Sequence, residues 1–238
     1  MFFAHAPEIW RRFPHLVPGV LVLAGVDART DVAALLPPWH ARARERLAAG
    51  PESELAPESQ LPEISAWRRA YAQMGLKPTQ YRSAAEALLR RFRREGDLPR
   101  VHPLVDVCNA LSLAFALPVA VFDLAGVAGH LEVRPAEGGE EHVGFGGEVE
   151  HAEPGEVIFA DADRHAHARR WTFRQSRLST VGADTHTVLI VAEGLHPAAA
   201  ADVPALIDAL AAALGGVWGA PRHRAVLTAS APRLEIAA

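Results

Sequence analysis

The amino-acid sequence predicts an α+β fold in which mostly antiparallel sheets are flanked by helices. Between residues 39 and 118, apolar side chains recur at the spacing of amphipathic helices. From residue 119 onward the chain changes to short runs rich in Val, Ile and Phe, separated by turns that contain Gly, Pro and Asp. Because these runs follow one another without intervening helices, the pattern does not fit a parallel sheet of alternating strands and helices.

The first third of the chain is predicted to contain one strand and two helices. A continuous apolar run at 20–26 is typical of a buried strand. A helix follows at 39–50 and ends at Gly50, and a linker rich in Pro, Glu and Ser spans 51–62. The second helix covers 62–75 and ends on a glycine, which is a common helix stop.

The strongest local pattern is the helix predicted over 83–94. Ser83 and Glu86 have the spacing of a capping box, in which each side chain bonds the backbone N–H of the other residue. The apolar stripe of this helix consists of Ala85, Leu88, Leu89 and Phe92. Its remaining surface carries Arg90, Arg91, Arg93 and Arg94. These arginines lie near the C-terminal end, where positive charge suits the helix dipole.

The second half of the chain is predicted to be mainly strands. One more helix precedes them at 102–118, with Pro103 in its first turn. The strand runs are 119–124, 130–135, 141–145, 156–161, 165–173 and 186–193. A last helix at 202–214 and a terminal strand at 223–236 complete the prediction.

Positive charge is concentrated in two stretches of an otherwise acidic chain. The formal net charge is −4, with 23 arginines and Lys77 as the single lysine. Residues 68–100 hold eight arginines and Lys77 against three acids, and residues 164–177 hold five arginines and no acid. The overall charge therefore gives no sign of general nucleic-acid binding, whereas the two stretches predict a local electrostatic footprint.

Composition also limits the compartment and the classes of site. Cys108 is the single cysteine, which excludes an intrachain disulfide and any multi-cysteine metal site. The first residues contain an acid and paired arginines where a signal peptide needs an apolar run. The longest apolar stretch lies near 16–26 and is too short to span a bilayer. We therefore expect a cytoplasmic protein that does not enter a membrane.

Standard catalytic and metal-binding patterns are not found. His165 and His167 would share one face of a strand, but no zinc motif supplies a third ligand, so we expect no metal and no cofactor. Asp161 and Asp163 are interpreted as a solvated turn. No nucleophile elbow is present, and Cys108 falls on the apolar side of a helix, where a thiol is usually inert.

What remains is a polar, arginine-rich constellation without a standard catalytic pattern. Its members are Tyr81, Arg82, Ser83, His102, Asp106, Asn109, Arg169, Arg170, Trp171, Arg174 and Gln175. Arginine interleaved with tryptophan suits phosphate contacts and base stacking. Ordinary core packing is the alternative for Trp171 and Phe173, and a solvated helix face is the alternative for the arginines at 90–94.

Three long segments, at 75–91, 98–124 and 169–176, resemble the B3/B4 domain. This domain occurs in the β subunit of bacterial phenylalanyl-tRNA synthetase and in stand-alone proteins of the same family. The resemblance covers about 60–196 and identifies the whole chain, 1–238, as a single B3/B4-like domain. Residues 1–59 and 197–238 are then N-terminal and C-terminal extensions. Nothing in the chain resembles the catalytic core of the synthetase, so a synthetase is not expected.

In the synthetase this domain hydrolyses tyrosine that was wrongly attached to the phenylalanine tRNA. The resemblance therefore implies a trans-acting aminoacyl-tRNA deacylase, an ester hydrolase whose partner is the aminoacylated 3′ end of a tRNA rather than DNA. One alternative is a non-catalytic module of the same fold that binds tRNA or a free amino acid. Another is a small-molecule enzyme that uses the same cleft, because a fold does not fix a function.

The resemblance assigns the candidate site residues to one cleft. Those given a catalytic role are Asp106, Asn109 and Gln175, of which the first two match an Asp-x-x-Asn pattern of the family and would orient the ester or a water. Those given to substrate and tRNA binding are Arg82, Arg170, Trp171, Arg174 and Glu193. The chain departs from the synthetase at two positions, since Ala120 replaces an editing-site His and Val191 aligns with a Glu that discriminates the amino acid. Glu193 lies two residues further on, facing the same side.

Overall fold

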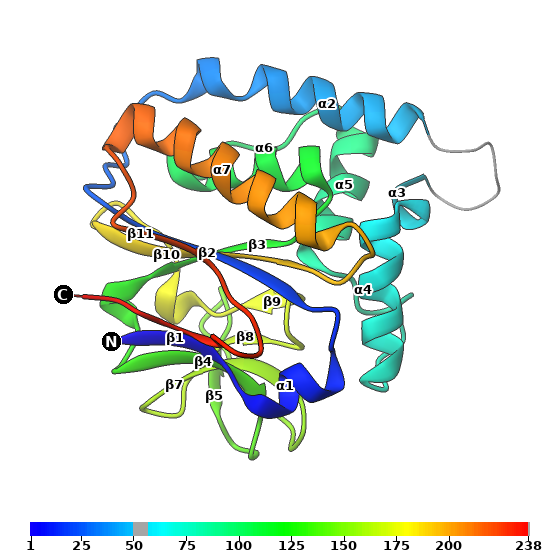
Figure 1. Ribbon diagram of the computed structural model, residues 1–238. Helices are drawn as coiled ribbons and strands as arrows, with labels where there is room; N and C mark the ends of the chain where they lie inside the picture. Colours follow the sequence, from blue (N-terminus) through cyan, green and yellow to red (C-terminus); the bar gives the residue numbers. More distant parts are fainter. Residues whose placement is uncertain (50–56, 238) are drawn as a thin grey trace.

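The computed structural model describes residues 1–49 and 57–237, and it arranges them in three layers (Figure 1). One layer is formed by helices, the middle layer by a four-stranded sheet, and the third by a six-stranded sheet. The two chain ends lie beside each other on the outer sheet. Gly50 and the first half of the linker predicted at 51–62 fall outside the described residues, and 57–60 form a short helix within the second half.

The middle sheet is antiparallel and buried on both faces. Its strands, in spatial order, are β11 (His223–Val226), β2 (Val17–Ala24), β10 (Thr187–Gly194) and β3 (Val119–Asp123). Because side chains alternate along a strand, Ile190 faces the helices whereas Leu189 and Val191 face the second sheet. Both faces of β10 are therefore apolar, which explains its continuous run of apolar residues.

The outer sheet is mixed. Its strands, in spatial order, are β12 (Arg233–Glu235), β1 (Phe2–His5), β4 (His130–Pro135), β7 (Val157–Asp161), β8 (Ala166–Arg169) and β9 (Arg174–Gln175). Only β1 and β4 pair in parallel. A separate hairpin joins β5 (Glu141–Val143) and β6 (Val149–His151).

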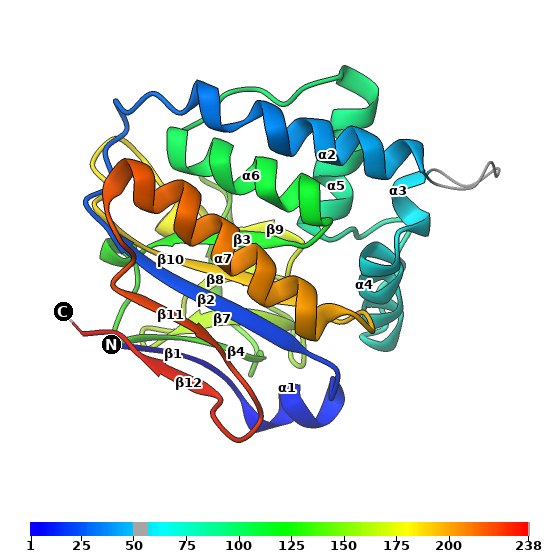
Figure 2. The same cartoon turned by 45° about the horizontal axis from the view of Figure 1, so that its top comes forward.

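Three long helices form the helical layer. They are α2 (Pro37–Ala48), α6 (Pro103–Phe115) and α7 (Ala199–Trp218), which lie side by side in Figure 2. Helices α6 and α7 pack on the middle sheet, and α2 packs on α6. Helix α7 can approach β2 closely because Gly19 has no side chain. A Cβ at this position would come within 2.5 Å of the Ile207 side chain. By length and apolar composition, α7 is the one helix in the described part of the chain that could cross a membrane, and its apolar face packs on the sheet.

Shorter helices complete the fold. They are α1 (Pro7–Arg12), α3 (Pro57–Gln60), α4 (Pro62–Gln73), α5 (Ala84–Glu95) and the single turns η1 (Ala33–Leu35), η2 (Leu124–Gly126) and η3 (Arg177–Ser179). Helix α5 confirms the helix predicted over 83–94, since the Ser83 hydroxyl accepts the Glu86 N–H at 3.3 Å. The predicted second bond of the capping box, from the Ser83 N–H to the Glu86 carboxylate, is wrong. That carboxylate accepts a hydrogen bond from Arg68 at 2.6 Å instead.

The α+β class and the antiparallel, helix-flanked sheets are confirmed, and the differences concern short segments. The terminal segment at 223–236 forms two strands in different sheets rather than one. The run at 165–173 leaves the strand conformation after Arg169, because the backbone turns there. The strand Phe2–His5 and the helix Pro7–Arg12 were not predicted; both are short and depend on distant partners.

Candidate functional site

A small cavity lies between the two sheets, beside the strands β3 and β10. Its volume is about 70 Å³. The lining residues are Ala84, Pro118, Val119, Ala120, Phe159, Ala168, Trp171, Thr172, Phe173, Arg174, Gln175, Val191 and Glu193. Ala120 and Val191 are direct cross-strand partners in the β3–β10 ladder. The two positions where the chain departs from the synthetase pattern therefore lie side by side on the cavity wall.

Glu193 contributes a buried carboxylate to this wall. Only 2% of the residue is exposed. One carboxylate oxygen lies 2.7 Å from Nε2 of His5, and the indole N–H of Trp171 donates to both oxygens at 3.0 Å. His5 comes from β1, and its other ring nitrogen has no hydrogen-bond partner among the described residues. No motif in the sequence indicated His5; only the pairing of β1 into the outer sheet brings it to Glu193.

The turn between β8 and β9 carries Trp171 into the core. Arg170 and Trp171 have φ values of 47° and 61°, a left-handed conformation that is uncommon for residues other than glycine. Two hydrogen bonds hold the turn: Trp171 N–H donates to the Val157 carbonyl at 2.7 Å, and Arg170 N–H donates to the Glu156 carboxylate at 2.9 Å. Trp171 is fully buried, so it walls the cavity and offers no exposed face for stacking a base.

Two polar side chains from β9 line the cavity beside this turn. Gln175 donates from Nε2 to the Val121 carbonyl at 2.6 Å, which fixes the amide against β3. Arg174 pairs with Glu150 at 2.9 Å and with Glu148 at 2.5 Å. The Arg174 guanidinium is therefore neutralised by carboxylates, and a phosphate would have to compete with them.

Arg170 and Arg82 lie near the cavity and differ in their partners. The guanidinium of Arg170 stacks over the Tyr81 ring at 4.7 Å, and it has no carboxylate partner in the part of the chain that the structure describes. Arg82 precedes Ala84, a residue of the cavity wall, by two positions. Its Nε lies 3.6 Å from the Glu86 carboxylate. Arg170 is therefore the arginine of this group whose charge is not balanced by a carboxylate.

Asp106 and Asn109 do not reach this cavity. They line a separate hollow with Arg100 and His40, near the N-terminal end of α6. The Asp106 carboxylate accepts the Val101 N–H at 3.0 Å, which secures the start of the helix. The sequence correctly places both residues on one helix, but the cavity lies beyond the opposite end of α6. The expectation that all eight candidate residues surround one cleft is therefore wrong.

Several arginines in both arginine-rich stretches form ion pairs with acids that lie elsewhere in the chain. In the second stretch, Arg169 bonds Glu156 and Glu150, each at 2.8 Å. Burial tends to raise the pKa of Glu156, but the hydrogen bonds and the charge of Arg169 outweigh burial and hold that pKa below its ordinary value. In the first stretch, Arg93 pairs with the buried Glu58 at 2.8 Å. Much of this charge therefore stabilises the fold.

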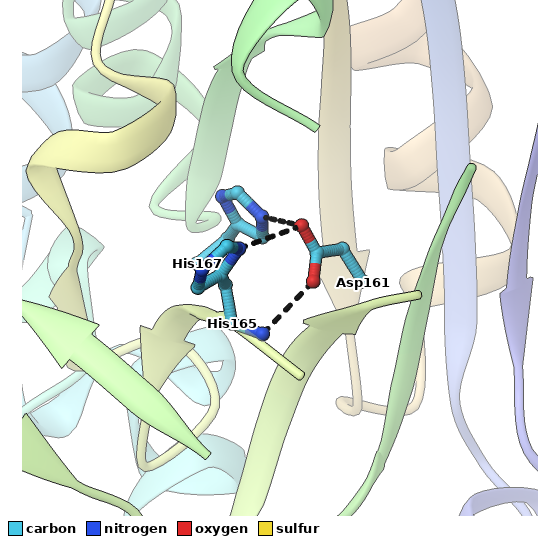
Figure 3. A group of neighbouring side chains, drawn as sticks. All are labelled: Asp161, His165 and His167. Atoms are coloured by element: carbon cyan, nitrogen blue, oxygen red, sulfur yellow. Dashed lines mark hydrogen bonds and ion pairs between the residues drawn. The ribbon is translucent and has the colours of Figure 1, made fainter. Parts of the chain in front are cut away.

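A second polar cluster lies where β7 turns into β8 (Figure 3). It consists of Asp161, His165 and His167, whose potential ligand atoms all lie within 4.8 Å of one another. Asp161 is only 3% exposed, so its interpretation as a solvated turn residue is wrong. Burial tends to raise the pKa of Asp161, but hydrogen bonds from His167 and from backbone N–H groups outweigh burial and lower the pKa to about 2. None of the three residues lines the cavity.

A family model and one curated relative agree with the resemblance in the sequence. A family model described as "B3/4 domain" matches residues 66–204. The phenylalanine–tRNA ligase β subunit of Cereibacter sphaeroides is 35% identical over 74 residues, which cover 31% of this chain and 9% of that subunit. A crystal structure of an N-terminal fragment of the phenylalanyl-tRNA synthetase β subunit from Pyrococcus horikoshii aligns with 90% of this chain and 47% of the fragment. That alignment has 10% sequence identity and a TM-score of 0.44. The chain thus matches less than half the length of either relative.

Proposed function

The chain belongs to the B3/4 domain family, and on this premise we propose that it acts on tRNA by hydrolysing the ester of a wrongly attached amino acid. The relation to the synthetase β subunit supports a tRNA-related function. The observation that carries the finer proposal is the cavity between the sheets, where an apolar wall meets the single carboxylate of Glu193. An aminoacyl ester combines an apolar side chain with an ammonium group, and such a cavity suits both.

The volume of the cavity favours a small amino-acid side chain. A cavity that holds a benzene ring measures about 150 Å³, roughly twice the space between these sheets. Ala120 and Val191 also offer no polar group at the two positions where the synthetase pattern has His and Glu. We therefore assign the cavity to a small aliphatic side chain rather than to the ring of tyrosine.

The charged groups divide the rest of the substrate between them. Glu193 attracts the α-ammonium group, because its buried carboxylate lines the cavity. Arg170 attracts a terminal phosphate of the tRNA, because its guanidinium has no carboxylate partner among residues 1–49 and 57–237. Asp106 and Asn109 have no part in this assignment, because they line the separate hollow.

The reaction needs no covalent intermediate. Nε2 of Gln175 is held by the Val121 carbonyl, which leaves its amide oxygen to accept a hydrogen bond from the attacking water. The water oxygen bonds to the carbonyl carbon, the ester bond to the ribose oxygen breaks, and that oxygen takes up the proton that the water loses. The products are the free amino acid and a tRNA with a free terminal hydroxyl.

The test is release of amino acid from a panel of misacylated tRNAs by the purified full-length chain. We expect release from at least one tRNA that carries a small aliphatic amino acid. The Arg170→Ala variant should release it more slowly, whereas Arg29→Ala, which removes an exposed arginine paired with Asp27, should behave like the parent chain. If no member of the panel is hydrolysed while salt-sensitive tRNA binding persists, the chain is a binding module and the hydrolase proposal is wrong.

A further inference from the structure

Five nitrogen atoms lie within hydrogen-bond distance of the Asp161 carboxylate, which has about four lone-pair sites. Oδ1 accepts the backbone N–H groups of Asp163 at 3.0 Å and of His165 at 2.8 Å. Oδ2 lies 3.1 Å from the Ala128 N–H, 3.2 Å from Nδ1 of His165 and 3.0 Å from Nε2 of His167. An ionised carboxylate offers about two lone-pair sites on each oxygen, so three donors at Oδ2 exceed its capacity.

A single cation can take the place of two of these donors. With a metal ion between the three side chains, Oδ2 would keep the Ala128 N–H on one lone pair and bind the ion with the other. His165 and His167 would then turn ring-nitrogen lone pairs, rather than protons, toward the same point. We propose that Asp161, His165 and His167 bind a divalent transition-metal ion of the zinc class.

The distances fit such an ion with small adjustments. Zinc bonds to imidazole nitrogen and carboxylate oxygen measure about 2.0–2.2 Å, so tetrahedral geometry places the ligand atoms about 3.3–3.5 Å apart. Oδ2 of Asp161 lies 3.2 Å from the His165 nitrogen and 3.0 Å from the His167 nitrogen. These two distances need to change by only a few tenths of an ångström to admit the ion, and all three ligand atoms lie within 4.8 Å of one another. The two imidazole rings are nearly perpendicular, at 86°, and their centroids are 6.3 Å apart.

A neighbouring residue supports the orientation of one ligand. Nδ1 of His167 lies 2.8 Å from the Ser179 hydroxyl in η3. A metal-bound histidine usually donates its other ring N–H to an oxygen, which fixes the tautomer and aims the ligating nitrogen. The side chains of Asp161 and His167 are fully buried, whereas that of His165 is 34% exposed. Solvent can therefore supply a fourth ligand on the side of His165.

A second group of potential ligands lacks these features. Glu63, His196 and Asp202 also lie within ligand distance of one another. Only one of them is a histidine, and the Arg46 guanidinium already bonds the Glu63 carboxylate at 2.5 Å. This positive charge repels a second cation, so the proposal concerns the β7–β8 cluster alone.

The ion would act on the wall of the cavity. Phe159 and Ala168 belong to β7 and β8 and line the cavity, while Asp161 ends β7 and His167 lies within β8. A metal bridge between these strands would hold the wall in place. This role is separate from the hydrolysis proposed above, and zinc binding is measured independently of any tRNA.

The experiment is a titration of the chelator-treated, full-length, untagged chain with Zn²⁺, followed by isothermal calorimetry. We expect one strong site in the parent chain and at least about 100-fold weaker binding in His165→Ala and Asp161→Asn, because each variant removes one ligand. His186→Ala removes an exposed histidine outside the cluster and should bind as the parent does. Co²⁺ in place of Zn²⁺ should give the intense visible absorption of a tetrahedral site, which His165→Ala should lose.

Two results would overturn the proposal. One is the absence of a one-to-one zinc complex in the parent chain, and the other is equal zinc affinity in the parent and in His165→Ala. If Asp161→Asn does not fold, the zinc affinities of His165→Ala and His165→Gln still test the proposal, because His165 is partly exposed. The folding of both variants is checked by circular dichroism. A metal site that forms without any tRNA hydrolysis would uphold this proposal while contradicting the proposed function.

Discussion

Glu193 and Asp161 are both buried carboxylates that bond histidine, yet they stand in different surroundings. Glu193 has two ring systems as partners, His5 and Trp171, and it borders the cavity. Asp161 is surrounded by three backbone N–H groups and two imidazoles, and it does not line the cavity that Glu193 borders. Burial alone therefore does not mark a substrate site; what matters is whether one side of the buried group faces open space.

The largest effect on stability is expected for Asp161→Ala. This change leaves backbone N–H groups and imidazoles in the buried hairpin without their acceptor. Removal of one partner from a buried ionic cluster typically costs about 3–5 kcal/mol. Urea unfolding of the metal-free chain measures this loss, and Glu193→Ala serves as the comparison. We expect Glu193→Ala to cost less, and a greater cost for Glu193→Ala would reverse the comparison between the two carboxylates.

Glu193→Gln should affect the proposed activity more than the fold. The amide keeps an oxygen that can accept from the Trp171 N–H, but it loses the charge that attracts the ammonium group. A hydrogen bond to a charged group contributes about 1.5–3 kcal/mol, which corresponds to a loss of roughly 10–100-fold in kcat/KM for amino-acid release. Unfolding in urea should change little. Unchanged release would show that Glu193 serves only the core.

Low pH should weaken the turn between β8 and β9, which carries Trp171. The pKa of Glu156 is held below its ordinary value of 4.5, so its ionised form is favoured by the folded state. The resulting stability is present above pH 4.5 and is lost as the pH falls through the lowered pKa. Glu156 faces Arg169 and the Arg170 N–H, while Glu150 shares Arg169.

This pH dependence is measured by comparing the free energy of unfolding of the parent chain with that of Glu156→Gln. At neutral pH the variant should be less stable by about 1–3 kcal/mol, because a charge-assisted acceptor for Arg169 is lost. The gap should narrow as the pH falls below 4.5. A gap that stays constant down to the acid limit would show that Glu156 does not titrate in this range.

The smallest effect is expected for Arg170→Ala. An arginine that contacts one phosphate contributes a uniform, salt-dependent part of tRNA affinity, and its loss should reduce the slope of log affinity against log salt by about one. The stacking on Tyr81 adds about 0.5–1 kcal/mol to the stability of the turn. Filter binding at several salt concentrations checks the slope. An unchanged slope would remove Arg170 from the tRNA-binding surface.

Local patterns in the sequence predicted those parts of the fold that local interactions determine. The helix over 83–94 follows from its apolar spacing and the Ser83 cap, and the strand at 130–135 matches β4 in full. The strand Phe2–His5 lacks such a local signal, because it is stabilised by pairing with β4 and β12. The contact between His5 and Glu193 spans 188 positions, a separation at which residue spacing carries no information.

The site was predicted in part for the same reason. Gln175 and Glu193 reach the cavity from strands that border it, and Trp171 reaches it from the turn between β8 and β9. Asp106 and Asn109 lie on one helix, as predicted. Residue spacing predicts which face of a helix two side chains share, but it does not predict the end of the helix at which a cavity opens. Asp161 ends a strand and precedes a polar turn, and its burial depends on contacts with the returning chain, such as that with His167 of β8.

The side chain that the cavity accepts is measured by comparing single-turnover release of two amino acids from the same tRNA body. One tRNA carries alanine or valine and the other carries tyrosine. The cavity of about 70 Å³, with Ala120 and Val191 on its wall, predicts faster release of the small aliphatic amino acid and little release of tyrosine. Preferential release of tyrosine would contradict the assignment of the cavity to a small side chain.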